Sequence, residues 1–201
     1  TSVRGPGARA ISAALRPNSS LQALKMGLNQ IAEGGVADEL ERSLRTSSTL
    51  TELDVSLCQL APYDSATLAR MLQENSSVRH LDISGNLTDE TFAPQLNEAL
   101  ALNNTLRELH AGQCGLFDDS AFAIAGGMRA HGALKVLHLS GNRITPTGVD
   151  AIAEALKTDQ RLRALYLDAN RVSDEGLRSL ANALAFNDGL LELSVRANRI
   201  T

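Results

Sequence analysis

The chain has 201 residues, of which 43% are hydrophobic, and its formal net charge of −4 comes from 19 basic and 23 acidic side chains. This length and hydrophobic content are ordinary for a folded protein, and the absence of a long single-sign charge run argues against nucleic acid or an anionic membrane as partner. No apolar run approaches the roughly 20 residues needed to span a bilayer. Aromatic residues amount to 3%, so aliphatic side chains must form the core, which favours a regular, repeated packing unit.

In chain order, the first predicted element is a helix within residues 1–20, because "GARAISAALRPNSS" matches the helical stretch "GVDAIAEALKTDQR" further along. From residue 21 onward the chain repeats itself. The leading apolar residues of the repeats are spaced first 29 and then 28 residues apart, at Leu21, Leu50, Val78, Leu106, Leu134, Leu162 and Leu190. Such a fixed period indicates a stacked array of similar units.

Each repeat predicts one strand followed by one helix. The repeats begin with the pattern L-x-x-L-x-L-x-x-N-x-I, as in "LKVLHLSGNRI" and "LRALYLDANRV". The apolar residues at the fourth and sixth places alternate with polar ones, which is typical of a short strand with one buried face. Over residues 147–161 and 173–187 the apolar residues recur at spacings of three and four, which predicts amphipathic helices.

Neither element can bury its apolar side alone, so the repeats must stack, strand beside strand and helix beside helix, into a solenoid. Strands lie about 4.8 Å apart whereas packed helices need about 8 to 10 Å, so the stack curves with the strands on its concave side. In repeat length and pattern the whole chain resembles leucine-rich repeat proteins, specifically their ribonuclease-inhibitor-like class. The resemblance implies an α/β horseshoe with parallel strands on the concave face and helices on the convex face.

We expect a single solenoid over residues 1–201. It would consist of a helical half-repeat over 1–20, six full repeats over 21–189 and a final strand over 190–201. Solenoids need polar capping units at their ends, and neither end of this sequence resembles one. The sequence therefore predicts a piece of a longer array or of a multidomain protein, either monomeric or part of a longer chain.

The ninth place of the repeats holds asparagine or cysteine: Asn29, Cys58, Asn86, Cys114, Asn142, Asn170 and Asn198. In leucine-rich repeat proteins this side chain points inward and hydrogen-bonds the backbone of the turn, so the resemblance implies a structural ladder. The cysteines stand two repeats apart, about 10 Å by strand spacing, which exceeds the roughly 7 Å that a disulfide allows between Cα atoms.

Two features favour a reducing cytosol. The cysteines are expected to be unpaired, and one of four glycosylation sequons falls on Asn86, a ladder position that would have to be buried. The predicted location is therefore cytoplasmic, which means the host cytoplasm if the chain comes from a bacterial effector.

Solenoids mainly use the concave strand surface for binding, and the third, fifth and seventh places of each repeat point outward there. These places carry acidic, histidine, tyrosine and arginine side chains, a mixture that suits protein recognition. The candidate partner-binding residues are Asp54, Asp82, His110, His138, Tyr166, Asp168 and Arg196. At the tenth place, Arg143, Arg171 and Arg199 form a candidate loop edge for an acidic protein or phosphates.

The sequence predicts no metal site, cofactor or catalytic residue. His80, Asp82, His110 and His138 lie on three neighbouring predicted strands and are ligand types that suit zinc, yet no H-x-x-H or C-x-x-C spacing supports a site. No Walker P-loop, H-E-x-x-H or G-x-S-x-G motif is present.

We therefore expect a noncatalytic module that binds a protein partner on the concave strand face. The resemblance leaves two alternatives open. The chain could be the targeting region of a larger protein, such as a bacterial effector or an innate-immunity sensor. It could instead be a regulator similar to the activators of the small GTPase Ran.

Overall fold

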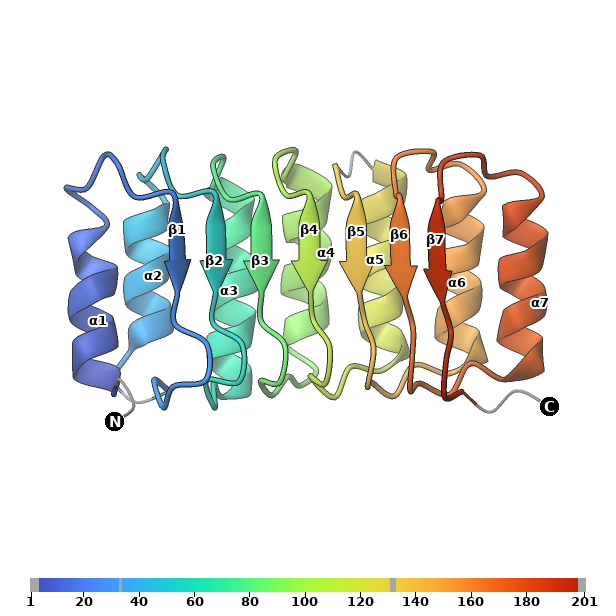
Figure 1. The fold of residues 1–201 in the computed structure, drawn as a ribbon, viewed down its shortest axis with the longest axis horizontal. Coiled ribbons are helices and arrows are strands. Elements are labelled where there is room, and N and C mark those ends of the chain that lie inside the picture. Colours follow the sequence, from blue (N-terminus) through green and yellow to red (C-terminus); the bar gives the residue numbers. More distant parts are fainter. Residues whose placement is uncertain (1–3, 33, 131–132, 199–201) are drawn as a thin grey trace.

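The computed structural model of the chain describes residues 4–32, 34–130 and 133–198. Within these residues seven helices alternate with seven strands, and the strands form one parallel sheet in chain order (Figure 1). Figure 1 shows the sheet in front and the helices behind it, so the protein has two layers. The predicted fold class, an α/β solenoid of stacked strand and helix units, is confirmed.

All seven strands are three residues long: β1 Ala23–Lys25, β2 Glu52–Asp54, β3 His80–Asp82, β4 Glu108–His110, β5 Val136–His138, β6 Ala164–Tyr166 and β7 Glu192–Ser194. The helices are α1 Gly5–Ala14, α2 Val36–Leu44, α3 Pro62–Glu74, α4 Phe92–Leu102, α5 Asp118–Ala130, α6 Pro146–Leu156 and α7 Ser173–Leu184. In this part of the chain no helix has the length and apolar character needed to cross a membrane.

The sequence period sets the register of the sheet. Fourth-place leucines pair across neighbouring strands, Leu53 with Leu81 and Leu81 with Leu109. These leucines and the sixth-place residues Val55 and Ile83 are at most 2% exposed. The helices complete the core with one fully buried aliphatic residue at the same place in each of six helices: Leu40, Leu68, Leu96, Ile124, Ile152 and Leu180. The core therefore runs as a continuous layer between the sheet and the helices.

Ninth-place asparagines hydrogen-bond the backbone of two repeats at once. The Oδ1 atom of Asn142 accepts from the backbone N–H groups of Cys114 and Leu116, each at 3.0 Å. Its Nδ2 atom donates to the carbonyls of Ala111 and Leu139, each at 2.8 Å. Asn86, Asn170 and Asn198 make similar bonds to the repeats that precede them. These bonds satisfy turn groups that the three-residue strands cannot reach.

The two ladder cysteines also hydrogen-bond the preceding repeat, each through its thiol group. Cys58 Sγ donates to the Met26 carbonyl at 3.1 Å, and Cys114 Sγ donates to the Ile83 carbonyl at 3.3 Å. Both thiols are free and buried, and burial raises their pKa values, that of Cys114 to about 11. Asn29 lies in the first turn, is half-buried, and donates to the Met26 carbonyl at 2.9 Å.

A second polar ladder lies where α3, α4 and α7 turn back toward a strand. Asn103 Oδ1 accepts from the N–H groups of Thr105 and Leu106 at 2.9 and 2.8 Å, while its Nδ2 donates to the carbonyls of Leu72 and Asn75 at 2.7 and 2.9 Å. The series comprises Asn75, Asn103 and Asn187. Asn75 and Asn103 directly follow α3 and α4. The helices α6 and α7 end at Leu156 and Leu184, before the ends of the helical patterns in the sequence.

The turn after every strand requires a left-handed backbone at the eighth place, where φ lies between 52° and 74°: Leu28, Leu57, Gly85, Gln113, Gly141, Ala169 and Ala197. At Gly85 an added Cβ would lie 2.3 Å from Leu57 Cδ2 of the preceding repeat, so this exposed leucine side chain would have to move. The residues other than glycine hold this conformation at a cost of roughly 1–2 kcal/mol each.

Candidate functional site

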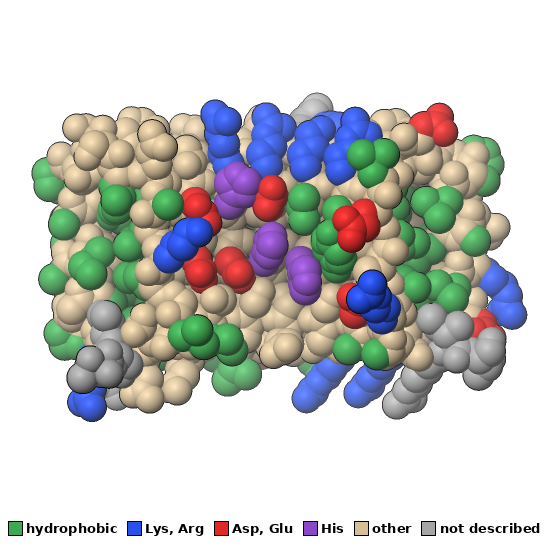
Figure 2. Space-filling model, viewed as in Figure 1, with side chains coloured by type: hydrophobic (Ala, Val, Ile, Leu, Met, Phe, Trp, Pro, Cys, Tyr) green, Lys and Arg blue, Asp and Glu red, His purple; other side chains and the backbone are tan. Residues whose placement is uncertain are grey.

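The candidate site lies on the strand face, the side of the sheet turned away from the helices and toward the viewer in Figure 2. The fifth-place residues pair in register, Asp54 with Asp82, Asp82 with His110, His110 with His138 and His138 with Tyr166. Five of the seven predicted binding residues therefore form one row across β2 to β6. Register alone brings them together, since neighbours in the row are 28 residues apart in the chain.

A shallow depression of about 280 Å³ lies over β1 to β4 and is lined mainly by charged and imidazole side chains. Its polar lining residues are Lys25, Glu52, Asp54, His80, Asp82, Glu108 and His110. Figure 2 shows Asp, Glu and His side chains gathered there. Four carboxylates against one lysine make this half of the strand face acidic at neutral pH.

Charged and imidazole side chains contact one another within this depression. Glu108 Oε2 lies 3.2 Å from His80 Nδ1 and 3.6 Å from His110 Nε2, so one carboxylate faces two imidazoles. Lys25 Nζ lies 2.7 Å from Glu52 Oε1, and this hydrogen-bonded pair raises the pKa of Lys25. Glu52, His80 and Glu108 were absent from the predicted binding set, although their third-place position placed them on the same face.

The two aspartates are oriented by their own turns. Asp54 Oδ1 accepts from the Ser56 N–H at 2.9 Å, and Asp82 Oδ1 accepts from the Ser84 N–H at 2.8 Å. Each carboxylate therefore stabilises the backbone that leaves the strand. Residues 4–32, 34–130 and 133–198 contain no group of three or more His, Cys, Asp or Glu side chains arranged to hold a metal ion.

The C-terminal half of the row is a column of rings. His138 stacks on His110 with centroids 5.6 Å apart and an interplanar angle of 12°, and it contacts Tyr166 at 5.2 Å and 31°. Burial lowers the pKa of His138, and the neighbouring His110 lowers it further. A hydrogen bond with Glu192 raises the pKa of Tyr166. The column therefore offers aromatic edges beside an acidic depression.

Asp168 and Arg196 lie beyond the row, in the turns that follow β6 and β7. Asp168 Oδ1 accepts from the Ser194 hydroxyl at 2.5 Å and from the Arg196 N–H at 2.6 Å. Asp168 thus joins two repeats, while the Arg196 side chain is exposed. Of these two predicted binding residues, Asp168 therefore stabilises the next repeat, and Arg196 is exposed to a partner.

The predicted loop edge, at the tenth place of the repeats, lies at the end of the turns farther from the strands. The Arg143 guanidinium stacks over the ring of Phe117 at 5.4 Å, and Phe117 is 53% exposed. Arg171 is exposed as well, and its backbone N–H donates to the Ile144 carbonyl at 2.9 Å. Arg199 lies outside the described residues. Figure 2 shows basic side chains projecting from this edge.

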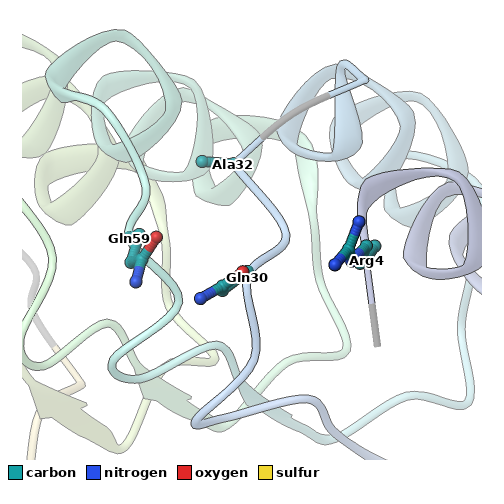
Figure 3. A pocket seen from close by; sticks show the side chains of 4 residues that line it. All are labelled: Arg4, Gln30, Ala32 and Gln59. Carbon is teal, nitrogen blue, oxygen red and sulfur yellow. The ribbon is translucent and has the colours of Figure 1, made fainter. Parts of the chain in front are cut away.

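A smaller cavity of about 220 Å³ lies at the same edge near the N-terminal end, lined by Arg4, Gln30, Ala32 and Gln59. Figure 3 shows Gln30 between Gln59 and Arg4. The backbone of Arg4 forms a parallel bridge with that of Gln30. The cavity therefore lies between the first turn of the solenoid and the start of α1.

Sequence analysis also missed a row of basic residues at the second place of four consecutive repeats: Arg79, Arg107, Lys135 and Arg163. The signal was present in the sequence, because a basic residue follows the leading apolar residue in each of these repeats.

Comparisons with known proteins agree with this geometry. The family described as Leucine Rich repeat matches residues 46–62, 134–153 and 159–181. The mouse (Mus musculus) protein called NACHT, LRR and PYD domains-containing protein 14 is 32% identical over 111 residues, which cover 55% of this chain and 11% of that protein. The human (Homo sapiens) NACHT, LRR and PYD domains-containing protein 13 is 30% identical over 111 residues, with the same two coverages.

The alignment thus spans about a tenth of the length of these relatives. Among solved structures, the one titled Leiomodin-1 Actin-Binding Site 2 superposes with a TM-score of 0.55 and 14% identity, covering 89% of this chain and 86% of the other. At that identity the likeness shows the fold alone. The matched repeats, the homologous repeat regions and the single parallel sheet of strand and helix units lead to one assignment: the chain is a leucine-rich repeat protein.

Proposed function

We propose that the chain is a noncatalytic recognition module whose strand face binds a protein partner. The observation that carries this proposal is the row of polar and aromatic side chains on β2 to β6. Backbone pairing holds the row in register from strand to strand. A surface that is already ordered loses little conformational freedom when a partner binds.

The two halves of the row suit different contacts. The acidic depression, with Asp54, Asp82 and Glu108, would attract a basic segment of the partner. The column of His110, His138 and Tyr166 would contact an apolar or aromatic side chain of the partner. The faces and edges of aromatic rings pack well against side chains of either kind. Tyrosine is a frequent anchor at the centre of protein interfaces.

The relatives support a second element of the proposal. Their names combine leucine-rich repeats with NACHT and PYD domains, and we propose that this chain is the repeat region of a larger protein of the innate-immunity sensor type. The buried, unpaired thiols of Cys58 and Cys114 support a reducing compartment such as the cytosol. The alternation of asparagine and cysteine in the ladder supports the ribonuclease-inhibitor-like class.

An affinity capture tests the binding face. The wild-type chain and the double variant His110→Glu with Tyr166→Glu are used as baits in a cell lysate, and captured proteins are identified by mass spectrometry. A matched control, Phe122→Glu with Asn182→Glu, introduces two glutamates at exposed positions on α5 and α7, on the helix side. We expect the partner to be retained by the control and lost from the strand-face variant. Equal capture by all three baits would refute binding through the strand face.

A further inference from the structure

Four basic side chains, Arg79, Arg107, Lys135 and Arg163, lie along the edge at which the strands begin, and we call them the basic row. Figure 2 shows Lys and Arg side chains lined up along this upper edge, over β3 to β6. The three arginines are exposed and Lys135 is half-buried. The row is separate from the predicted loop edge, which lies at the other end of the strands.

Backbone hydrogen bonds set the spacing of the basic row. The N–H of Arg107 donates to the Arg79 carbonyl at 2.7 Å, that of Lys135 to the Arg107 carbonyl at 2.7 Å, and that of Arg163 to the Lys135 carbonyl at 2.8 Å. Neighbouring strands lie about 4.8 Å apart, so the four attachment points cover roughly 14 Å. The row is therefore a regularly spaced series of basic side chains across the strands.

No ion pair among the described residues neutralises the charges of the basic row. Other arginines are paired, as Arg70 is with Glu41 at 2.8 Å. Arg107 and Arg163 instead donate to the carbonyls of Ala133 and Gly189. These neutral acceptors orient the guanidinium groups and leave their charge available for a partner.

The surroundings of the basic row restrict the kind of partner. The acidic depression lies beside it on the same face, with Glu52, Asp54, Asp82 and Glu108. A nucleic acid or an anionic bilayer spreads negative charge over a wide area and would meet these carboxylates as well as the row. A protein with a narrow acidic stripe avoids that repulsion, and its neighbouring basic groups could face the depression.

Spacing further restricts the conformation of that stripe. In an α-helix, acidic residues at i, i+3, i+7 and i+10 lie on one side at heights of about 0, 4.5, 10.5 and 15 Å. The strands of the row lie at about 0, 4.8, 9.6 and 14.4 Å. In an extended segment, side chains on one face recur only every 6.7 Å or so, and four of them would cover about 20 Å.

We propose that the basic row binds an α-helix of a protein partner that presents aspartate or glutamate along one side and lies across the strands. The proposal rests on the proposed function, in which the strand face recognises a protein. It adds the chemistry and the secondary structure of the segment that meets the edge.

The test uses a fluorescein-labelled, alanine-based helical peptide with glutamates at i, i+3, i+7 and i+10, and fluorescence anisotropy at low ionic strength. A second peptide of identical composition distributes the glutamates around the helix. The row variant is Arg107→Glu with Lys135→Glu. The matched control, Arg129→Glu with Arg178→Glu, makes the same charge change at exposed positions on α5 and α7, on the helix side. Circular dichroism checks that all proteins are folded.

We expect the striped peptide to bind the wild type and the control within about twofold of each other, and the row variant at least about tenfold more weakly. The distributed peptide should bind more weakly than the striped one. The proposal is overturned if the wild type does not bind the striped peptide, if both variants lose affinity equally, or if the two peptides bind alike. It is also overturned if a single-stranded RNA oligonucleotide binds more tightly and depends on the same residues.

The lysate capture separates this proposal from the proposed function. If the row variant retains a partner that the His110→Glu with Tyr166→Glu variant loses, strand-face recognition stands and the basic row has no part in it. If the strand-face variant retains every partner, the proposed function fails, and the peptide titration still decides whether the row binds an acidic helix.

Discussion

The imidazole of His138 lies face to face with that of His110, with centroids 5.6 Å apart, while its own Nδ1 atom is buried without a hydrogen-bond partner in the described structure. The same nitrogen lies over Gly112, where an added Cβ would come within 3.2 Å of it. His138 is therefore held as a neutral ring between His110 and Tyr166, and a side chain at position 112 would press on this ring.

Replacing His138 by phenylalanine should keep the ring and remove the buried, unpaired nitrogen. We expect His138→Phe to raise the free energy of unfolding at neutral pH by about 1 kcal/mol. Because burial lowers the pKa of His138 below its ordinary value of 6.5, the unfolded chain takes up this proton more readily than the folded one. Stability should therefore fall as the pH drops below about 6.5. Urea unfolding at about pH 7.5 and 5.5 should show a smaller fall in the variant, and an unchanged pH dependence would contradict this assignment.

Loss of a ladder asparagine should cost more in the middle of the array than at its first turn. Asn142→Ala removes the partners of two backbone N–H groups and two carbonyls, so we expect a loss of about 3 kcal/mol or more. Asn29→Ala, at a half-buried position, should cost about 1 kcal/mol. Chemical denaturation of both variants measures the difference. Equal losses would show that the ladder does not act through buried bonds.

The left-handed turn predicts a stabilising substitution. Ala169 has a φ of 52°, which glycine adopts without steric strain, so Ala169→Gly should raise the free energy of unfolding by about 0.5–1 kcal/mol. Ala10→Gly, at an exposed position inside α1, should lower it by a similar amount, because glycine weakens a helix. Thermal unfolding of the two variants distinguishes the turn from the helix. A decrease for Ala169→Gly would show that the methyl group contributes packing that outweighs the strain.

Thiol reactivity should report on the ladder cysteines. Burial raises the pKa values of Cys58 and Cys114, the latter to about 11, so both remain protonated near neutral pH and are shielded from reagents. We expect slow reaction of the folded protein with a disulfide reagent such as Ellman's reagent, and immediate reaction of both thiols in denaturant. Rapid modification of the folded chain would mean that the turns open readily.

The sequence by itself determined the repeat, the alternation of strand and helix, and the inward position of the fourth, sixth and ninth places. These follow from local periodicity: a two-residue alternation marks a buried strand face, and a fixed interval of 28 residues forces equivalent positions into neighbouring strands. Leu53 and Leu81 are paired and buried for that reason. The same interval places Asp54, Asp82, His110, His138 and Tyr166 in one row.

Only the tertiary structure decided which of these side chains interact with one another. Glu108 faces His80 of the preceding repeat and His110 of its own repeat, and Asp168 supports the turn of the next repeat. Which side chains meet depends on their rotamers and distances after stacking. In the second asparagine ladder, Asn103 donates to the carbonyls of Leu72 and Asn75 at the end of the preceding helix. These groups come within hydrogen-bond distance only when the repeats stack. Stacking likewise brings the like charges of the basic row together along one edge of the sheet, and the row has no ion pair in the part of the chain that the structure describes.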